Sequence, residues 1–431
     1  MACRQKSNDS TYKKYFNDAL LYSKTVKQLN DVVLENNFPP MIASRNYAYA
    51  NIAAYECMAA GDSSYQSLSG QIKHLPAMPK PPAEREIDFS FAALLAFTKV
   101  GNAVTFPEGS MMVYYEDLKK KAASEGILDE VINNSIAFSD SIVAAVLRWS
   151  KKDNYAQTRS AERFAIVSEE EGRWIPTPPT YISAVEPHWD EIRPIIMDSA
   201  SQFMPPRPPL FDVKNKSSIF YKAMMGVKNT GDSLTEEQKQ IADFWDDNPF
   251  KMTVVGHASY ATKKFSPPGH WMNIVGIAAQ KSNADFNTTV AAYTETAITL
   301  FDAFISCWDE KYRSNYIRPE TAINKYVSNS WRPYIQTPPF PSYISGHATI
   351  SGAAAEVMTY WFGDKLSFSD TSLVEFGIKP RIINSFREAA KEAALSRMYG
   401  GIHFSFDNNE GNKAGIKLGQ LILQRIKLKR N

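Results

Sequence analysis

Residues 341–347 read PSYISGH, follow a run of prolines and open a segment rich in alanine, serine and glycine that has the character of a helix. Ser345 suits the N-cap of that helix, so the next backbone N–H groups lack helical partners and lie at the positive end of the dipole. Gly346 lets an anion approach the backbone, and His347 in the first turn can exchange a proton with a bound group. This stretch predicts an oxyanion site. The plainer alternative is a capped helix with a surface histidine.

Three cationic side chains lie in segments on either side of this stretch. If residues 287–314 form one helix, Lys311 extends its apolar face, and Arg397 shares a face with apolar residues of a later helix. The proline after Arg318 places that arginine in a turn beyond the first helix. Three inward cations repel one another unless an anion neutralises them. We therefore predict a shared tetrahedral oxyanion, phosphate or vanadate, rather than separate salt bridges to distant carboxylates.

In order and spacing these residues resemble a three-part signature. It is shared by the vanadium-dependent haloperoxidases and the type 2 phosphatidic acid phosphatase family, which includes bacterial class A acid phosphatases. The resemblance covers roughly the last third of the chain. The matching positions are Lys311, Arg318, Ser345, Gly346, His347, Arg397 and His403. Ile344 departs from the signature, which has proline immediately before Ser-Gly-His.

The resemblance to haloperoxidases implies vanadate as the cofactor and hydrogen peroxide and a halide as the substrates. It implies that His403 is the axial ligand of the metal and that His347 takes a proton from peroxide while a halide is oxidised to a hypohalous species. The side chains of Lys311, Arg318, Arg397 and Ser345 and the amide of Gly346 would neutralise the vanadate oxygens.

The alternative within the same superfamily is a soluble acid phosphatase that hydrolyses phosphomonoesters at the same site. Phosphate then occupies the pocket, His403 attacks phosphorus to form a phosphohistidine, and His347 protonates the leaving alcohol. The same cations stabilise the equatorial oxygens in either reaction.

Features outside the signature favour the haloperoxidase. The chain of 431 residues is long for an acid phosphatase of this family and resembles the two-bundle haloperoxidase build. Trp308 precedes the lysine by three residues, as in fungal-type chloroperoxidases. Phe340 occupies the place of the haloperoxidase residue that faces the halide, although core packing explains both aromatics equally well.

The resemblance further implies that Asp246 or Asp247 supports Arg397. The alternative is that these two residues form a solvated acidic helix end.

The fold class predicted by apolar periodicity is all-α, because no sustained period-two alternation occurs. Prolines crowd residues 152–216, and helical patterns lie on both sides of them. We therefore expect an N-terminal helical bundle (residues 1–151), a proline-rich connector packed on the body (152–216) and a C-terminal bundle that carries the oxyanion site (217–431). The expected helices cover residues 11–35, 42–60, 87–105, 111–123, 129–151, 219–225, 236–246, 287–314 and the segments after Ser345 and Ser385.

Composition limits the partners. A formal charge of +2 gives no electrostatic case for nucleic acid or an anionic membrane, and no run of eighteen apolar residues predicts a membrane span. We expect a soluble protein, and both a monomer and a homo-oligomer are compatible with the sequence. It is periplasmic or lipid-anchored through Cys3 if an upstream signal was trimmed, and cytoplasmic otherwise.

Overall fold

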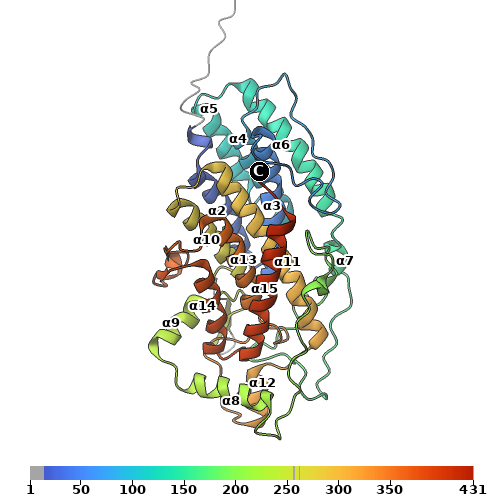
Figure 1. The fold of residues 1–431 in the computed structure, drawn as a ribbon, viewed down its shortest axis with the longest axis vertical. Coiled ribbons are helices and arrows are strands. Elements are labelled where there is room, and N and C mark those ends of the chain that lie inside the picture. Colours follow the sequence, from blue (N-terminus) through green and yellow to red (C-terminus); the bar gives the residue numbers. More distant parts are fainter. Residues whose placement is uncertain (1–13, 256–257, 262, 431) are drawn as a thin grey trace, which may run out of the picture.

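The computed structural model describes residues 14–255, 258–261 and 263–430, and most of these residues are helical (Figure 1). The first group of helices is α2 (Ala19–Glu35), α3 (Pro40–Gly61), α4 (Phe89–Val104), α5 (Met112–Ser124), α6 (Asp129–Ser150) and α7 (Tyr155–Thr158). The second group is α8 (Ile219–Asp232), α9 (Glu236–Phe244), α10 (Pro267–Lys281), α11 (Phe286–Ser314), α12 (Pro319–Tyr326), α13 (Gly346–Phe362), α14 (Phe386–Tyr399) and α15 (Ser405–Arg425). The predicted all-α class is confirmed.

Two small antiparallel hairpins were not predicted. Strand β1 (Met252–Val255) pairs with β2 (Ala258–Ala261), and β3 (Phe368–Asp370) pairs with β4 (Arg381–Ile383). Strands of three or four residues are too short to show the alternation from which a strand is predicted. They add local structure without changing the fold class.

The first expected helix is interrupted. Residues 14–16 are helical, the helix breaks at residues 17–18, and α2 begins at Ala19, where the Asp18 carboxylate accepts a hydrogen bond from the Leu20 N–H at 2.9 Å and caps the helix. The expected start at residue 11 lies outside the described residues. The Cys3 on which the lipid anchor depends lies outside the described residues.

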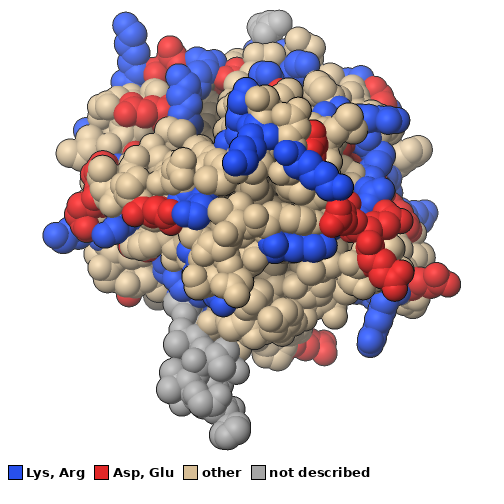
Figure 2. All heavy atoms as spheres, turned by 90° about the horizontal axis from the view of Figure 1, so that it is seen from below, with Lys and Arg blue, Asp and Glu red and all other residues tan. Residues whose placement is uncertain are grey.

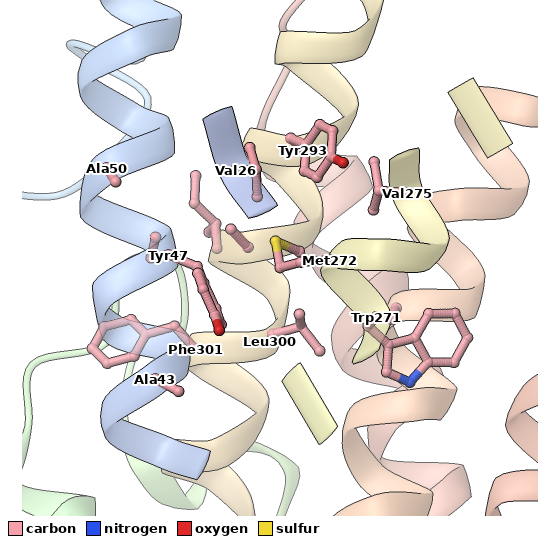
Figure 3. Close-up of a cluster of buried hydrophobic side chains, with 14 of the residues drawn as sticks. Val26, Ala43, Tyr47, Ala50, Trp271, Met272, Val275, Tyr293, Leu300 and Phe301 are labelled. Atoms are coloured by element: carbon pink, nitrogen blue, oxygen red, sulfur yellow. The ribbon is translucent and has the colours of Figure 1, made fainter. Parts of the chain in front are cut away.

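Helix α11 lies at the centre of the molecule and is buried along most of its length. Figure 3 shows how its side chains meet those of three neighbouring helices: Leu300 and Phe301 of α11 lie among Val26 of α2, Tyr47 of α3 and Met272 of α10. Each large apolar side chain buried in this way contributes about 1.5–3 kcal/mol. The central helix is thus a rigid base for Lys311, which lies in its last turn.

Helices α13 and α15 pack backbone against backbone. A Cβ atom on Gly415 would lie 2.0 Å from the carbonyl oxygen of Thr349, and one on Gly419 would lie 2.6 Å from that of Ala353. Only glycine permits this approach. The contact fixes the start of α13, which carries Ser345 and His347, relative to the start of α15, which follows His403.

The predicted connector, residues 152–216, contains only α7 and two short 3₁₀ turns, η1 (Trp189–Glu191) and η2 (Ala200–Phe203). Asp302 of α11 anchors this connector. The buried Asp302 carboxylate accepts hydrogen bonds from the backbone N–H groups of residues 195–197 at 2.7–2.9 Å. One continuous apolar cluster includes residues of both predicted bundles, such as Leu29 and Leu418. The domain boundaries at 151/152 and 216/217 stay predictions.

The surface bears mixed charge. At the end of the molecule formed by α8 and α12, Lys and Arg side chains are spread among acidic ones (Figure 2). Of the described helices, α6 is long and apolar enough by length and composition to cross a membrane, and half of its apolar window is buried inside the molecule. Core helices of globular proteins pass the same test.

Candidate functional site

Four of the signature residues line one pocket. Gly346 and His347 come from the first turn of α13, Arg397 from the last turn of α14, and His403 from the turn before α15. The pocket wall also includes Pro40, Asp247, Asn248, Pro249, Phe250, Pro267, Phe304, Trp308, Pro338 and Phe340. The other three signature residues, Lys311, Arg318 and Ser345, are buried beside this wall.

Ser345 caps α13. Its hydroxyl accepts a hydrogen bond from the Ala348 N–H at 3.4 Å, and its own N–H donates to the carbonyl of Asp407 at 3.0 Å. Ile344, which stands where the signature has proline, follows a cis peptide bond. A Cβ atom on Gly346 would lie 3.6 Å from the Trp308 ring, which is an ordinary contact distance. The start of α13 therefore lies against the aromatic wall of the pocket.

The carboxylate of Asp407 fixes the ring of His403. Its Nδ1 lies 2.9 Å from Oδ2 of Asp407, and the same oxygen accepts hydrogen bonds from the Ser342 hydroxyl at 2.5 Å and the Phe404 N–H at 3.1 Å. Burial lowers the pKa of His403 well below its usual value, and Arg318, Lys311 and Arg397 lower it further. The ring is therefore neutral at pH 7, with the proton assigned to Nδ1 and a lone pair left on Nε2.

Asp407 was not among the predicted site residues. Burial raises the pKa of its carboxyl to about 6, against the lowering effect of Ser342 and of the nearby cations. The sequence does contain a signal for the contact between the two residues, because Asp407 follows His403 by four residues. An acidic residue in the first turn of a helix is, however, explained equally well by the helix dipole.

Arg318 precedes α12 and is fully buried. Its Nε donates to the carbonyl of Phe340 at 2.8 Å, and its Nη1 donates to the carbonyl of Ile402 at 2.9 Å and to Nε2 of His403 at 3.0 Å. Burial lowers its pKa to about 9. These bonds fix the guanidinium plane against the lone pair of His403.

Lys311 is also fully buried. Its Nζ donates to the carbonyl of Pro341 at 2.8 Å and to that of Ser342 at 3.0 Å, which ties α11 to the loop before α13. Burial, together with the charge of Arg318, lowers its pKa to about 7. A buried anion nearby would favour the charged form again.

Arg397 meets the segment that follows α9. Its Nη1 donates to the carbonyl of Trp245 at 2.7 Å, and burial lowers its pKa to about 10. The side chain of His347 also forms a hydrogen bond to the backbone of Trp245. Its Nε2 lies 3.9 Å from Oδ2 of Asp247. Burial lowers the pKa of His347 well below its usual value, and Arg397 and His270 lower it further. His347 is thus a neutral base at pH 7.

The two acidic residues predicted to support Arg397 form their ion pairs with other groups. Asp246 pairs with Lys251 at 2.8 Å and lies 3.7 Å from Lys264. Asp247 pairs with Nδ1 of His270 at 3.0 Å. Both carboxylates still lie close enough to raise the pKa of Arg397 against the effect of burial.

Trp308 and Phe340 form an aromatic wall on one side of the pocket. Their ring centres are 4.9 Å apart, and both rings are buried. The indole N–H of Trp308 donates to the carbonyl of Val185 at 3.2 Å, so the connector fixes this ring. The ammonium group of Lys311 lies 5.0 Å from the centre of the Phe340 ring.

The donor groups of this site fit a tetrahedral oxyanion. Within the described parts of the chain, Nη2 of Arg318, Nε of Arg397 and Nε2 of His347 are buried and have no hydrogen-bond partner. A buried guanidinium N–H without a partner costs about 1–3 kcal/mol or more. Two arginines, a lysine, a helix N-terminus and a neutral imidazole whose Nε2 faces Arg318 are groups that suit a tetrahedral oxyanion such as vanadate.

Comparisons with known proteins identify the family. The family model described as "VCPO second helical-bundle domain" matches residues 324–431. No curated protein matches the chain. A solved structure of a bacterial vanadium-dependent iodoperoxidase is 40% identical, covers 96% of this chain and 98% of its own, and superposes with a TM-score of 0.91.

Two structures of bacterial vanadium-dependent chloroperoxidase share the fold. The holo form is 17% identical over 90% of this chain and 92% of its own, with a TM-score of 0.66. The apo form is 16% identical over 90% and 94%, with a TM-score of 0.67.

Proposed function

This chain belongs to the vanadium-dependent haloperoxidases, and from that premise we propose which of its groups carry the reaction and that its halide is iodide. The enzyme oxidises a halide with hydrogen peroxide: one halide, one peroxide and one proton give one hypohalous acid and one water. The phosphatase alternative is not favoured, because the similar solved structures are haloperoxidases.

Vanadate is the cofactor that the family implies, and when bound it supplies the Lewis acid that polarises hydrogen peroxide. His403 would ligate it through Nε2, because Asp407 holds the proton on Nδ1. Arg318 and Arg397 would donate to its oxygens with the buried N–H groups that lack other partners within the described residues. Lys311, Ser345 and the Gly346 amide complete the set.

His347 is the group that moves protons. Its pKa is lowered by burial and by Arg397, so at neutral pH Nε2 accepts a proton from hydrogen peroxide. The same nitrogen then returns the proton to the oxygen that leaves as water. Asp247, 3.9 Å from Nε2, stabilises the charge that His347 acquires between the two steps.

The 40% identity to an iodoperoxidase over nearly the whole chain is the observation that carries the choice of iodide. The pocket is consistent with it. Beside the buried cations its wall is aromatic and proline-rich, with Phe250, Trp308 and Phe340. Such a wall replaces little of an anion's hydration shell. Iodide is the largest of the three candidate halides, and the cost of desolvating an ion falls as its radius grows.

The test is a halide comparison on purified protein loaded with orthovanadate. With hydrogen peroxide in excess, kcat/KM is measured for iodide, bromide and chloride at one pH. The order iodide, then bromide, then chloride is expected, with iodide at least tenfold above bromide. Chloride turnover equal to that of iodide would refute the proposed halide while leaving the haloperoxidase reaction intact.

The substitution Phe340→His is a second test of how the aromatic wall determines the halide preference. It introduces a polar donor beside Lys311, so the penalty for small, strongly hydrated halides falls. We expect the bromide-to-iodide ratio of kcat/KM to rise with no loss of bound vanadate. Val113→His, at an exposed position in α5, serves as the control and changes neither quantity.

A further inference from the structure

We propose that His270 is a positioning residue of this site: it holds the segment Trp245–Asp247 where that segment contacts Arg397 and faces His347. His270 was not among the predicted site residues, and the reaction described above does not use it. It lies in the first turn of α10 and is fully buried. The inference deepens the proposed function and rests on it.

Both ring nitrogens of His270 are bound to carboxylates. Nδ1 lies 3.0 and 3.2 Å from the two oxygens of Asp247, and Nε2 lies 2.9 Å from Oδ2 of Asp370 in β3. An ionised carboxylate can accept hydrogen bonds but cannot donate them. Both ring nitrogens therefore donate, and the ring is an imidazolium. Burial would lower the pKa of His270, but the two carboxylates outweigh it and raise the pKa to about 10.

The ring also stacks on the segment that it holds. The Trp245 indole lies 4.8 Å from the His270 ring centre at an interplanar angle of 28°. The indole N–H of Trp245 donates to Glu392 of α14 at 3.0 Å. Two contacts, one from α10 and one from α14, thus fix both the direction of Trp245 and the position of its carbonyl.

That segment meets the site at two points. The carbonyl of Trp245 accepts from Nη1 of Arg397 at 2.7 Å, and it also bonds to His347. The carboxylate of Asp247 lines the pocket at 3.9 Å from Nε2 of His347. No hydrogen bond joins His270 to Arg397 or His347 within the described residues, so His270 positions them through Trp245 and Asp247. The charge of His270 also acts directly, by lowering the pKa of His347.

A wholly structural histidine does not need this arrangement. Two carboxylates on one buried imidazole are costly to desolvate, and an apolar side chain would pack the same volume at lower cost. The arrangement makes sense if the Asp247 carboxylate must be aimed at His347. The contacts of His270 Nδ1 with both oxygens of Asp247, at 3.2 and 3.0 Å, hold the carboxylate in that direction.

The test uses the full chain with two substitutions, His270→Gln and Asp370→Asn. His270→Gln removes the charge and the stacking on Trp245. Asp370→Asn keeps an acceptor for Nε2, so this variant remains informative if the first fails to fold. The matched control is His188→Gln: His188 is more exposed and pairs with Glu191 at 2.8 Å, but it does not line the pocket.

The first readout is oxyanion binding to the apo-enzyme, measured by titration calorimetry with orthovanadate and separately with inorganic phosphate. Loss of a group that orients a ligand's partner typically costs about 10–100-fold in affinity. We expect the dissociation constants of both anions to rise about tenfold in His270→Gln, less in Asp370→Asn and not at all in His188→Gln. Phosphate binding does not depend on halide chemistry, so this readout tests His270 even if the proposed reaction fails.

The second readout is the split between kcat and KM in the vanadate-loaded enzyme. We expect kcat to fall in both variants, while KM for iodide stays within twofold, because within the described residues the ring contacts of Trp308 and Phe340 are made with each other and with Phe304, not with Trp245. The proposal is overturned if thermal stability falls but both anion affinities and kcat stay within twofold of wild type. In that case His270 has only a structural role.

Discussion

The Asp407 carboxylate oxygen that faces His403 accepts hydrogen bonds from the Ser342 hydroxyl and the Phe404 N–H as well. These bonds fix the carboxylate, and the carboxylate fixes the histidine ring and its tautomer. A single residue thereby determines whether Nε2 of His403 presents a lone pair to the pocket.

Asp407→Asn tests this dependence. The amide loses the charge and one of the acceptor oxygens, so His403 is held less firmly in the tautomer that ligates a metal. We expect vanadate affinity of the apo-enzyme to fall by about 10–100-fold, measured by equilibrium dialysis. Asp117→Asn, at an exposed position in α5, is the control and keeps wild-type affinity. An unchanged affinity in Asp407→Asn would mean that Asp407 does not orient the ligand.

Single residues also show what the sequence could and could not reveal. Helical periodicity was enough to predict that Lys311 and Arg397 point inward, because both lie on apolar faces of regular helices. It could not reveal the partners of His270, since Asp247 and Asp370 come from a loop and a strand that are distant in the chain. The pairing of Asp246 with Lys251 instead of Arg397 likewise depends on how the loop after α9 turns.

At the scale of elements, the site depends on the contact between α13 and α15. The first helix presents Gly346 and His347, the second begins just after His403, and glycines of α15 let the two backbones touch. The spacing between the helices is therefore part of the geometry of the oxyanion site.

Gly415→Ala tests that spacing. The added methyl would lie 2.0 Å from the carbonyl oxygen of Thr349, so the helices must separate or shift. Overpacking of this kind costs about 1–3 kcal/mol in the free energy of unfolding, and vanadate affinity should fall with it. The control is Gly226→Ala in α8, where a Cβ has nothing within 4 Å and helix propensity predicts a gain of up to about 1 kcal/mol. Equal stability of the two variants, measured by urea unfolding, would show that the close contact is not required.

Elements also differ in how well sequence predicts them. The helices from α3 to α6 and helix α11 were predicted to within a few residues, because their apolar patterns are long and regular. The hairpins β1–β2 and β3–β4 were missed, because strands of three or four residues are too short to show the alternation from which a strand is predicted. Asp370 in β3 belongs to the His270 cluster, so the missed element carries part of the site's support.

For the molecule as a whole, buried carboxylates make stability depend on pH. Glu295 of α11 is buried and accepts a hydrogen bond from the Trp361 indole N–H at 2.7 Å. Burial raises its pKa to about 7 from an unfolded value near 4.5. Between these two values the folded state binds more protons than the unfolded state, so this residue lowers stability as pH rises from about 4.5 to 7.

Glu295→Gln should remove that pH-dependent penalty, because the amide stays neutral and can still accept from Trp361. The free energies of unfolding of variant and wild type should be similar at pH 4.5. At pH 8 we expect the variant to be more stable by about 1–3 kcal/mol. Glu84→Gln, at an exposed position, is the control at both pH values. A variant that is no more stable than wild type at pH 8 would show that Glu295 is not held above its usual pKa.

We propose that one site built from α11, α13, α14 and the turn before α15 binds vanadate and uses it to oxidise a halide. The direct measurement is a titration of metal-free protein with orthovanadate, in which iodide oxidation by hydrogen peroxide is followed at each step. Cleavage of a phosphomonoester is measured in parallel on vanadate-free protein. We expect iodide oxidation to rise linearly and stop at one vanadate per chain, with phosphoester cleavage negligible beside it. Vanadate demonstrably bound without any halide oxidation, together with efficient phosphoester cleavage, would contradict the claim.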